Sequence, residues 1–381
     1  MTDLNTNAPK VVNEAYSYLP SNVYDQTLKR IHWLYDNFPN VVVSMSGGKD
    51  STVIYEMTQI VAKQRGIEKV PVMWLDQECE YEATVDYMTK IMTRPDVEPF
   101  WMQVPFRLFN ATSTTEEWLN VWGEGEEWTR DKHPVSYKEN IYGTDRFKEL
   151  MNAISEHHHE GMAIITGMRV EESPARRATL TSLPSYKWCT WATKAKNHYI
   201  FHPIYDWVWR DIWKAIHDNK WDYNRHYDEM YRYGVSPLKM RVSNYHHETA
   251  LSGLFRLQEI EPQTYAKAVK RLRGLSTAAH LGQEDFYVKD LPFMFTSWME
   301  YRDYLLVNLL PEEKHETFRK KFETMENLAR RFKVTDPKEF DHIYKIQTQS
   351  IVTNDVDFTK ITNAILALRI RWRKMQEASD G

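Results

Sequence analysis

The chain has little cysteine, no long hydrophobic run and no large excess of either charge. Only Cys79 and Cys189 occur among its 381 residues, which is too few for a disulfide framework and favours a reducing cytoplasm. No apolar stretch approaches the roughly 20 residues that a membrane helix needs. The polar start Met-Thr-Asp-Leu-Asn-Thr-Asn lacks the basic and apolar regions of a signal peptide. We therefore expect a cytoplasmic protein without membrane spans or disulfides.

The net charge is small, and the sequence lacks the usual metal-ligand patterns. The formal net charge is −4 and the pI about 6.4, which gives no overall electrostatic footprint for nucleic acid but leaves a local basic patch open. The histidine runs at 157–160 and 246–248 lack metal-ligand spacing, and His-Glu-x-x-His is absent, so we predict no structural zinc. With 42% hydrophobic residues, the chain can fold as one large domain or two ordinary ones.

The most informative segment runs from residue 41 to 51 and reads Val-Val-Val-Ser-Met-Ser-Gly-Gly-Lys-Asp-Ser. A β-branched run, a small-residue turn and an apolar-periodic stretch predict strand, turn and helix. Two successive glycines let several N–H groups point at one anion, and the helix N-terminus adds partial positive charge. With the lysine charge and the serine hydroxyls, the turn predicts a phosphate or pyrophosphate site made of Ser46, Gly47, Gly48, Lys49, Asp50 and Ser51.

This turn differs from the Walker phosphate loop. Val43 stands at the first glycine position of Gly-x-x-x-x-Gly-Lys-Ser/Thr, and Asp50 follows the lysine. The alternative is an ordinary strand–helix turn with capping serines. The six-residue string directly after a hydrophobic strand favours the phosphate site.

Strand and helix signals alternate along the first part of the chain. The predicted strands are 41–45, 70–75, 99–104 and 162–166, and the predicted helices are 22–37, 51–64, 81–92 and 145–157. The alternation predicts an α/β fold, a mainly parallel sheet with helices on both faces, with ligands at the carboxyl ends of the strands. We expect a flexible N-terminal arm at 1–20, this α/β domain at 21–240 and a helical C-terminal extension at 241–381.

Two regions depart from the alternation. Residues 105–144 carry several tryptophans among acidic residues, and we interpret them as an insertion at the ligand edge, either a lid or a packed excursion. Beyond about residue 240 the strand signals fade. Helical periodicity there predicts helices at 246–259, 262–273, 296–309, 311–332 and 358–378.

A second charged segment, residues 166–177, reads Thr-Gly-Met-Arg-Val-Glu-Glu-Ser-Pro-Ala-Arg-Arg and is called the arginine loop below. It follows a predicted strand, so it should lie at the same sheet edge as the glycine turn. Arginine forks hold phosphate or sulfate bidentately, glutamate can orient an arginine or bind through a metal, and serine can cap the next turn. The candidates are Gly167, Arg169, Glu172, Ser173, Arg176 and Arg177, and a merely solvated loop is the alternative.

A third segment, residues 202–213, reads His-Pro-Ile-Tyr-Asp-Trp-Val-Trp-Arg-Asp-Ile-Trp, in which Asp206 is predicted to cap a helix. In this order, the three segments resemble the PP-loop superfamily, in particular the phosphoadenosine phosphosulfate (PAPS) reductase-like proteins and the small subunit of ATP sulfurylase. The resemblance covers residues 25–235. The string 74–81 resembles the family's second strand, which ends in Asp76 beside the nucleotide. The C-terminal extension resembles, less specifically, the immunoglobulin-binding regulator A-like branch, usually paired with a ParB-like protein.

The resemblance implies an adenine nucleotide alpha hydrolase-like fold that binds ATP, PAPS or adenosine phosphosulfate (APS) with Mg²⁺. It implies cleavage of ATP between the α and β phosphates, with AMP transfer or pyrophosphate release. The PP-loop, residues 46–51, would hold the departing pyrophosphate, and Arg169 and Arg176 would hold the acceptor anion or the α-phosphate. Asp50 and Asp76 are the candidate Mg²⁺ ligands. The implied catalytic residues are Lys49, Asp50, Arg169 and Arg176.

The sequence departs from the reductases in its cysteines. Thiol-dependent members attack sulfur with a C-terminal cysteine, whereas no cysteine follows Cys189 here, and two cysteines cannot supply four thiolates to an iron–sulfur cluster. We predict no cluster and no chemical need for either thiol.

Two other functions are left open. One is a nucleotide-dependent regulatory or DNA-associated module with a ParB-like partner, suggested by basic stretches such as 369–374. The other is a sulfonucleotide reductase or sulfurylase-like enzyme, the reductase with a thiol supplied in trans. A homo-oligomer is also left open.

Overall fold

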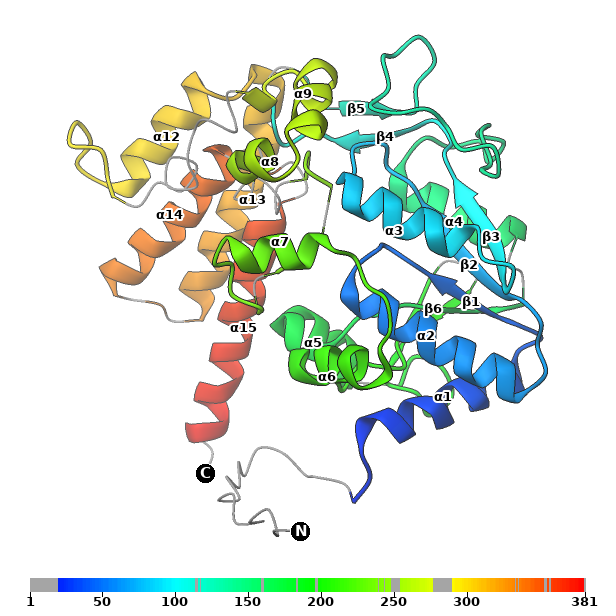
Figure 1. Ribbon diagram of the computed structural model, residues 1–381. Coiled ribbons are helices and arrows are strands. Elements are labelled where there is room, and N and C mark those ends of the chain that lie inside the picture. Colours follow the sequence, from blue (N-terminus) through cyan, green and yellow to red (C-terminus); the bar gives the residue numbers. More distant parts are fainter. Residues whose placement is uncertain are drawn as a thin grey trace, which may run out of the picture.

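A computed structural model describes residues 20–379, apart from 114–115, 117, 159–160, 183, 196–197, 239, 243, 248–253, 277–289, 333, 335, 353–354 and 356–357. Apart from Pro20, the predicted N-terminal arm lies outside the described residues. Figure 1 shows an α/β part beside a group of helices from the last part of the chain. Within the described ranges, no helix combines the length and apolar character that crossing a bilayer requires.

The α/β part is built around a six-stranded sheet in the order β3-β2-β1-β6-β8-β7. Neighbouring strands are parallel except for the β7–β8 pair. Because β1 pairs with β2 on one side and with β6 on the other, the loops that follow β1 and β6 leave the sheet at one edge. The strands are β1 (Val41–Ser44), β2 (Val70–Leu75), β3 (Val97–Met102), β6 (Ala163–Ile165), β7 (Ala192–Lys194) and β8 (Tyr199–Phe201).

Helices cover both faces of the sheet, which confirms the predicted α/β fold. Successive strand residues point to opposite faces, so Val41 and Val43 join a core with α1 and α2, whereas Val42 joins a second core with α4. The helices of this part are α1 (Val23–Asn37), α2 (Lys49–Gln64), α3 (Glu82–Met92), α4 (Phe147–His158), the 3-10 turn η1 (Val170–Glu172), α5 (Pro174–Thr181), α6 (Trp209–Asn219) and α7 (His226–Arg232).

One predicted helix cap is wrong. Asp206 does not cap α6, because the residue that precedes the helix is Val208, whose N–H donates to the carboxylate of Asp211 at 2.8 Å. Asp206 instead forms an ion pair with Arg30 of α1 at 2.6 Å. The pair ties the segment before α6 to the first helix, and this long-range partner outcompetes the local cap.

The insertion at 105–144 contains a two-stranded antiparallel hairpin that the sequence analysis did not predict, β4 (Phe106–Phe109) with β5 (Trp118–Val121). Trp122, directly after β5, is fully buried, and its indole N–H donates to the carbonyl oxygen of Asp76 at 2.8 Å. The hairpin is therefore anchored at the end of β2. This arrangement favours the packed excursion over the lid.

The C-terminal region is helical, as predicted. Its helices are α8 (Leu254–Ile260), α9 (Pro262–Arg271), α12 (Trp298–Asn308), α13 (Glu312–Arg331), α14 (Pro337–Val352) and α15 (Thr359–Ser379). The predicted helix 246–259 begins only at Leu254 among the described residues, and α14 was not predicted. Its buried face includes Gln347, Thr348 and Ser350, and these polar residues mask the apolar periodicity. α15 also packs against α5, the helix that begins within the arginine loop (Figure 1).

Candidate functional site

The PP-loop connects β1 to α2 as a tight turn. Gly47 has φ +71°, a left-handed conformation that favours glycine, and a Cβ atom there would lie 2.8 Å from the Thr84 side chain. Gly48 caps α2, and the N–H of Lys49 donates to the Tyr227 hydroxyl at 3.1 Å. Within the described part of the chain, the N–H groups of Gly47, Gly48 and Asp50 have no acceptor. The turn therefore presents N–H donors at a helix N-terminus, which is the arrangement that binds anions.

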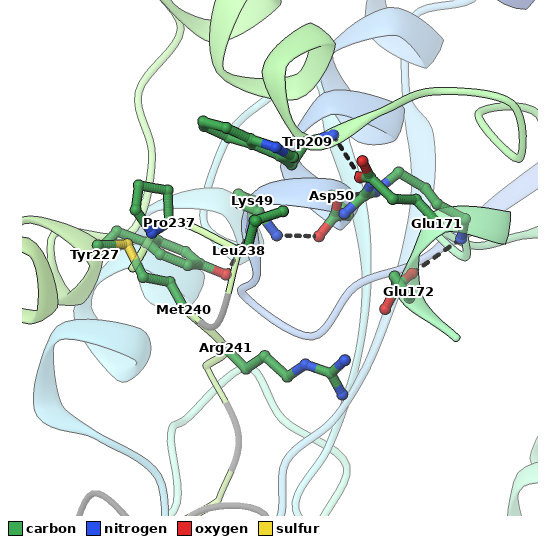
Figure 2. A pocket seen from close by; sticks show the side chains of 11 residues that line it. Lys49, Asp50, Glu171, Glu172, Trp209, Tyr227, Pro237, Leu238, Met240 and Arg241 are labelled. Carbon is green, nitrogen blue, oxygen red and sulfur yellow. Dashed lines mark hydrogen bonds and ion pairs between the residues drawn. The ribbon is translucent and has the colours of Figure 1, made fainter. Parts of the chain in front are cut away.

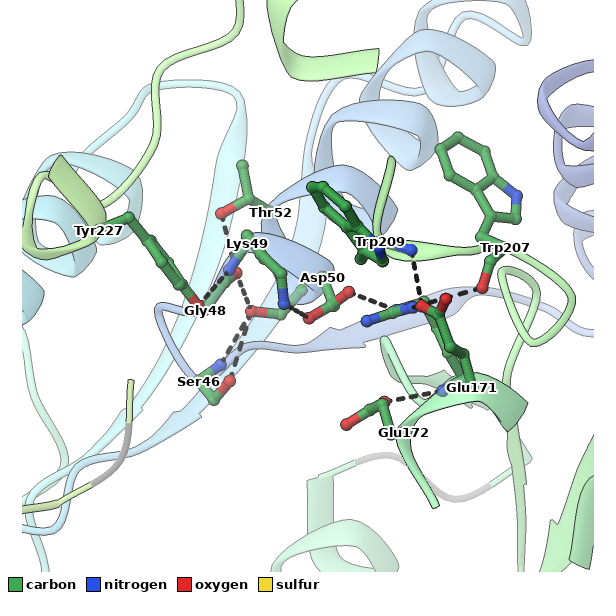
Figure 3. Close-up of polar contacts among 12 residues, drawn as sticks. Ser46, Gly48, Lys49, Asp50, Thr52, Glu171, Glu172, Trp207, Trp209 and Tyr227 are labelled. Atoms are coloured by element: carbon green, nitrogen blue, oxygen red, sulfur yellow. Dashed lines mark hydrogen bonds and ion pairs between the residues drawn. The ribbon is translucent and has the colours of Figure 1, made fainter. Parts of the chain in front are cut away.

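Asp50 connects the PP-loop to the arginine loop. Its Oδ2 lies 2.7 Å from Nζ of Lys49, and its Oδ1 lies 2.6 Å from Nε of Arg169. Arg169 also forms an ion pair with Glu171 at 2.7 Å. Figure 3 shows Lys49, Asp50 and Glu171 close together in this row of charges. Burial lowers the pKa of Lys49, while the adjacent Asp50 carboxylate raises it and so favours the charged form. The structure thus brings together Lys49, Asp50 and Arg169, as the sequence analysis expected from the two loops.

Gly167 makes this close approach possible. A Cβ atom at this position would lie 2.7 Å from the carbonyl carbon of Asp50 and 2.8 Å from the N atom of Ser51. Both are backbone atoms in the first turn of α2, which cannot move aside as a flexible side chain could. The glycine therefore lets the arginine loop lie directly on the N-terminus of α2.

Glu172 and Ser173 organise the arginine loop from within. Glu172 accepts from the Arg169 N–H at 2.9 Å and forms an ion pair with Arg176. Ser173 caps α5 by accepting from the Arg176 N–H at 3.1 Å, as predicted. Burial and the nearby Arg241 charge lower the pKa of Arg176. The exposed Arg177 lies on α5 outside the pocket described next.

A polar pocket of about 140 Å³ opens beside these residues (Figure 2). One wall comes from the PP-loop and the arginine loop, through Lys49, Asp50, Arg169, Glu171 and Glu172. The segment after α7 also contributes to the lining, through residues that include Leu238 and Arg241. The remaining lining residues are Trp209, Tyr227, Pro237 and Met240. The other PP-loop residues, Ser46, Gly47, Gly48 and Ser51, do not line this pocket.

Arg241 is the functional candidate that the sequence analysis missed. Figure 2 shows it reaching into the pocket region from the side opposite Trp209. Its charge contributes to lowering the pKa of both Lys49 and Arg176, so the three cations lie within electrostatic reach of one another. Among the described residues it has no ion-pair partner. The sequence signal is a single basic residue after the stretch 221–227, which no local pattern distinguishes.

Asp76 is placed differently from the other predicted site residues. It is fully buried at the end of β2 and does not line the pocket. Its Oδ2 accepts from Trp101 and Gln103, each at 2.9 Å, and its Oδ1 pairs with Arg130 at 2.5 Å. Asp76 therefore anchors neighbouring segments of the fold. No cluster of three or more His, Cys, Asp or Glu side chains suited to a metal occurs within the described ranges.

The two cysteines lie away from the pocket. Both side chains are fully buried, and neither lines the cavity. Burial raises the pKa of Cys189 to about 11 and that of Cys79 well above its ordinary value. A thiol in such surroundings is a weak nucleophile, because the thiolate is the reactive form.

Two relatives show the extent of the sequence similarity. The chain is 27% identical to the uncharacterized protein YbdN of Escherichia coli (strain K12) over 80% of this chain and 79% of that protein. It is 22% identical to an adenosine 5'-phosphosulfate reductase of Lysinibacillus sphaericus (strain C3-41) over 55% of this chain and 77% of that enzyme. Residues 234–370 also match a second family, described as a domain of unknown function (DUF3440).

Solved structures show weaker similarity. A PAPS reductase from Candida auris in a phosphate complex is 14% identical, with a TM-score of 0.32, over 61% of this chain and 98% of that one. An FMN adenylyltransferase from Candida glabrata, in complex with FAD and inorganic pyrophosphate, is 14% identical with a TM-score of 0.36 over 54% of this chain. The chain spans 58% of that structure's length.

The α/β part of the chain shows which family the protein belongs to. The phosphoadenosine phosphosulfate reductase domain matches residues 40–233, about half of the chain, and this range contains the PP-loop, the arginine loop and the segment that leads into α6. Its motifs converge on one sheet edge, with Asp50 joining the first two. The chain belongs to the phosphoadenosine phosphosulfate reductase domain family of PP-loop, nucleotide-binding proteins.

Proposed function

We propose that the pocket binds the phosphates of ATP or a related adenine nucleotide, and that the chain cleaves ATP between the α and β phosphates. AMP would pass to an acceptor, or pyrophosphate would be released. The observation that carries the proposal is the convergence of three cations, Lys49, Arg169 and Arg241, on one pocket at the N-terminus of a helix. Such a site stabilises the negative charge that grows on a departing pyrophosphate.

The contacts suggest distinct roles for the cations. Arg169 is 4% exposed and bonded to both Asp50 and Glu171, so we assign it mainly to positioning. Lys49 can exchange its bond to Asp50 for a phosphate oxygen, because an ammonium donates in three directions. Arg241 and the half-buried Arg176 lie closer to solvent and would hold the acceptor anion or the α-phosphate. No side-chain nucleophile is required, since phosphoryl-type transfer rests on positioning and electrostatics.

The predicted Mg²⁺ ligands do not suit a resident metal. Asp50 directs one oxygen to Lys49 and the other to Arg169, and both oxygens of Asp76 accept hydrogen bonds from buried donors. Each carboxylate would have to release cations or donors before it could bind a metal. The proposed reaction is therefore assigned to the cations of the chain itself.

The cysteine arrangement separates this proposal from sulfonucleotide reduction. Cys79 and Cys189 are buried outside the pocket, so reduction by a thiol of this chain is not part of the proposal. The ParB-like partner and the regulator A-like branch stay predictions from the resemblance, and a homo-oligomer stays open.

Calorimetric titration with ATP, APS and PAPS tests the binding step. Lys49→Ala should weaken nucleotide binding by about tenfold to a hundredfold, because a charge-assisted hydrogen bond contributes roughly 1.5–3 kcal/mol. Lys63→Ala is a matched control, since Lys63 lies in the last turn of the same helix and is exposed. Equal affinity in the Lys49 variant and the parent, with both folded by circular dichroism, would refute the assignment.

The cleavage step needs a separate readout. Pyrophosphate release from ATP should fall in Arg176→Ala and Arg241→Ala by a larger factor than ATP affinity, because an interaction made mainly in the transition state appears in kcat. Binding of ATP without release of pyrophosphate, with or without added anions, would leave a nucleotide-binding protein and contradict the proposed cleavage.

A further inference from the structure

A second cavity lies in the C-terminal helical region, where the end of α13 meets α15. Its volume is about 490 Å³, within the range of ordinary small-ligand sites. It is lined by six residues, which we call the α13/α15 groove: Leu328, Arg331, Phe332, Arg369, Trp372 and Arg373. None of them belongs to the PP-loop pocket. Half of the lining is arginine, and two of the remaining three residues are aromatic.

The arginines of the groove are available cations. Arg331, Arg369 and Arg373 are exposed, and none forms an ion pair within the described ranges. Their neighbours behave differently. Arg330 pairs with Glu326 at 3.3 Å and Arg371 pairs with Glu339 at 2.6 Å. The carboxylates of Glu326 and Glu339 thus pair with arginines outside the groove. The positive charge of the arginines inside the groove is not neutralised by these two carboxylates.

The two aromatic residues of the groove stack on each other. The rings of Phe332 and Trp372 stack with centroids 5.5 Å apart and planes 20° apart, and both side chains are partly exposed. Arg369 and Arg373 are four residues apart on α15, so they lie on one face about 6 Å apart along the helix axis. The groove therefore combines guanidinium groups with stacked aromatic rings, and Arg369, Trp372 and Arg373 lie within roughly one helical turn of α15.

We propose that the α13/α15 groove binds single-stranded nucleic acid, with bases stacked on the Phe332–Trp372 pair and phosphates held by the three arginines. An aromatic platform flanked by cations is the combination that unpaired strands use, because every unpaired base offers a π-face. A duplex hides those faces inside its stack, and an acidic peptide supplies charge without regular planar rings. The site is separate from the proposed ATP cleavage, so either function can fail without the other.

Fluorescence anisotropy on the full chain tests the groove. The probe is a labelled oligothymidylate of about 12 nucleotides, within the usual site sizes of single-strand binders. The double variant Arg369→Gln/Arg373→Gln should weaken binding by at least about tenfold and reduce the slope of log K against log salt by about 1.4, or 0.7 per lost phosphate contact. Trp372→Leu should weaken binding by about fivefold to a hundredfold, the range of one base–aromatic stack.

Arg371→Gln is the matched control, because it removes the same charge from the same helix outside the groove. It should retain nearly the parent affinity. The arginine double variant leaves the ring pair intact, so it remains informative if the Trp372 variant does not fold. An equal loss in Arg371→Gln, equal affinity for a duplex of the same length, or equal displacement by polyglutamate would each overturn the proposal. Displacement by AMP at comparable concentration would assign the groove to a free nucleotide and overturn it too.

Discussion

Removal of Arg169 should destabilise the fold more than removal of any other predicted site cation. The side chain is 4% exposed and donates to Asp50 at 2.6 Å, to Glu171 at 2.7 Å and to the Trp207 carbonyl oxygen at 3.3 Å. Breaking a buried pair from one side costs about 3–5 kcal/mol, because the partner is left buried without compensation. Asp50 and Glu171 are 20% and 30% exposed, and Asp50 keeps Lys49. We therefore expect Arg169→Ala to lower the free energy of unfolding by about 2–3 kcal/mol.

Arg176 supplies the matched comparison within the arginine loop. Its side chain is 38% exposed, and its partner Glu172 lies one helical turn away in sequence. Ion pairs with one partner open to solvent contribute about 0–1 kcal/mol, so Arg176→Ala should lower stability by less than Arg169→Ala does. Urea denaturation followed by tryptophan fluorescence, in buffer without phosphate or sulfate, measures both variants at comparable m-values.

A double-mutant cycle isolates the contact with Asp50. Asp50→Asn combined with Arg169→Ala should cost less than the sum of the two single changes, by about 0.5–3 kcal/mol. Arg169→Lys should recover less than half of the loss, because an ammonium cannot reach both carboxylates as a planar fork does. Equal stability losses in the Arg169 and Arg176 variants, together with a coupling energy near zero, would refute the positioning role.

The remaining predictions concern packing, thiols and pH. Gly167→Ala should destabilise the protein by about 1–3 kcal/mol in urea melts, because the added methyl would overlap the backbone of α2, and an unchanged midpoint would contradict this close approach. Replacement of Cys79 and Cys189 by Ala should preserve pyrophosphate release, whereas a folded but inactive variant would revive thiol chemistry. Burial, and less strongly the Arg176 charge, lower the pKa of His202 to about 4. A depressed histidine pKa stabilises the fold above the unfolded value of about 6.5 and loses that stabilisation as pH falls toward 4. The loss amounts to about 3 kcal/mol, so His202→Asn should flatten the acid limb of a stability–pH curve, and an unchanged limb would refute it.

The sequence predicted the first half of the site because its signals are local. A β-branched strand, two glycines and a periodic helix fix the PP-loop within eleven residues, and the cap at Ser173 depends only on Arg176, three residues later. The meeting of Asp50 and Arg169 follows from topology, since parallel strands β1 and β6 place their following loops at one edge. This meeting could be expected from a parallel sheet in general, without knowledge of the individual side-chain contacts.

The missed features all depend on partners far away in sequence. Asp206 sits where a helix cap would be expected, but Arg30, 176 positions earlier, takes its carboxylate. Asp76 ends its strand as the resemblance predicts, yet donors from Trp101, Gln103 and Arg130 hold both of its oxygens. Arg241 belongs to the pocket only because the chain after α7 folds back over the PP-loop. The partner of each of these side chains is determined by tertiary contacts, and local sequence patterns contain no information about such contacts.

In the proposed function, Lys49 and Arg241 would contribute to anion binding in different physical ways. Lys49 is 6% exposed and already forms an ion pair with Asp50. The binding free energy of a phosphate there is therefore only the difference between the new ion pair and the one it replaces. That difference is large for its kind, because the effective dielectric constant of the buried site is low. Arg241 is exposed and has no ion-pair partner among the described residues, so its whole charge is free but screened by water. At 4 Å, two charges interact by about 4 kcal/mol at an effective dielectric of 20 and by about 1 kcal/mol in water. Lys49→Ala should therefore weaken ATP binding more than Arg241→Ala. Added salt should erase the Arg241 effect while leaving most of the Lys49 effect, because screening acts on exposed charges first.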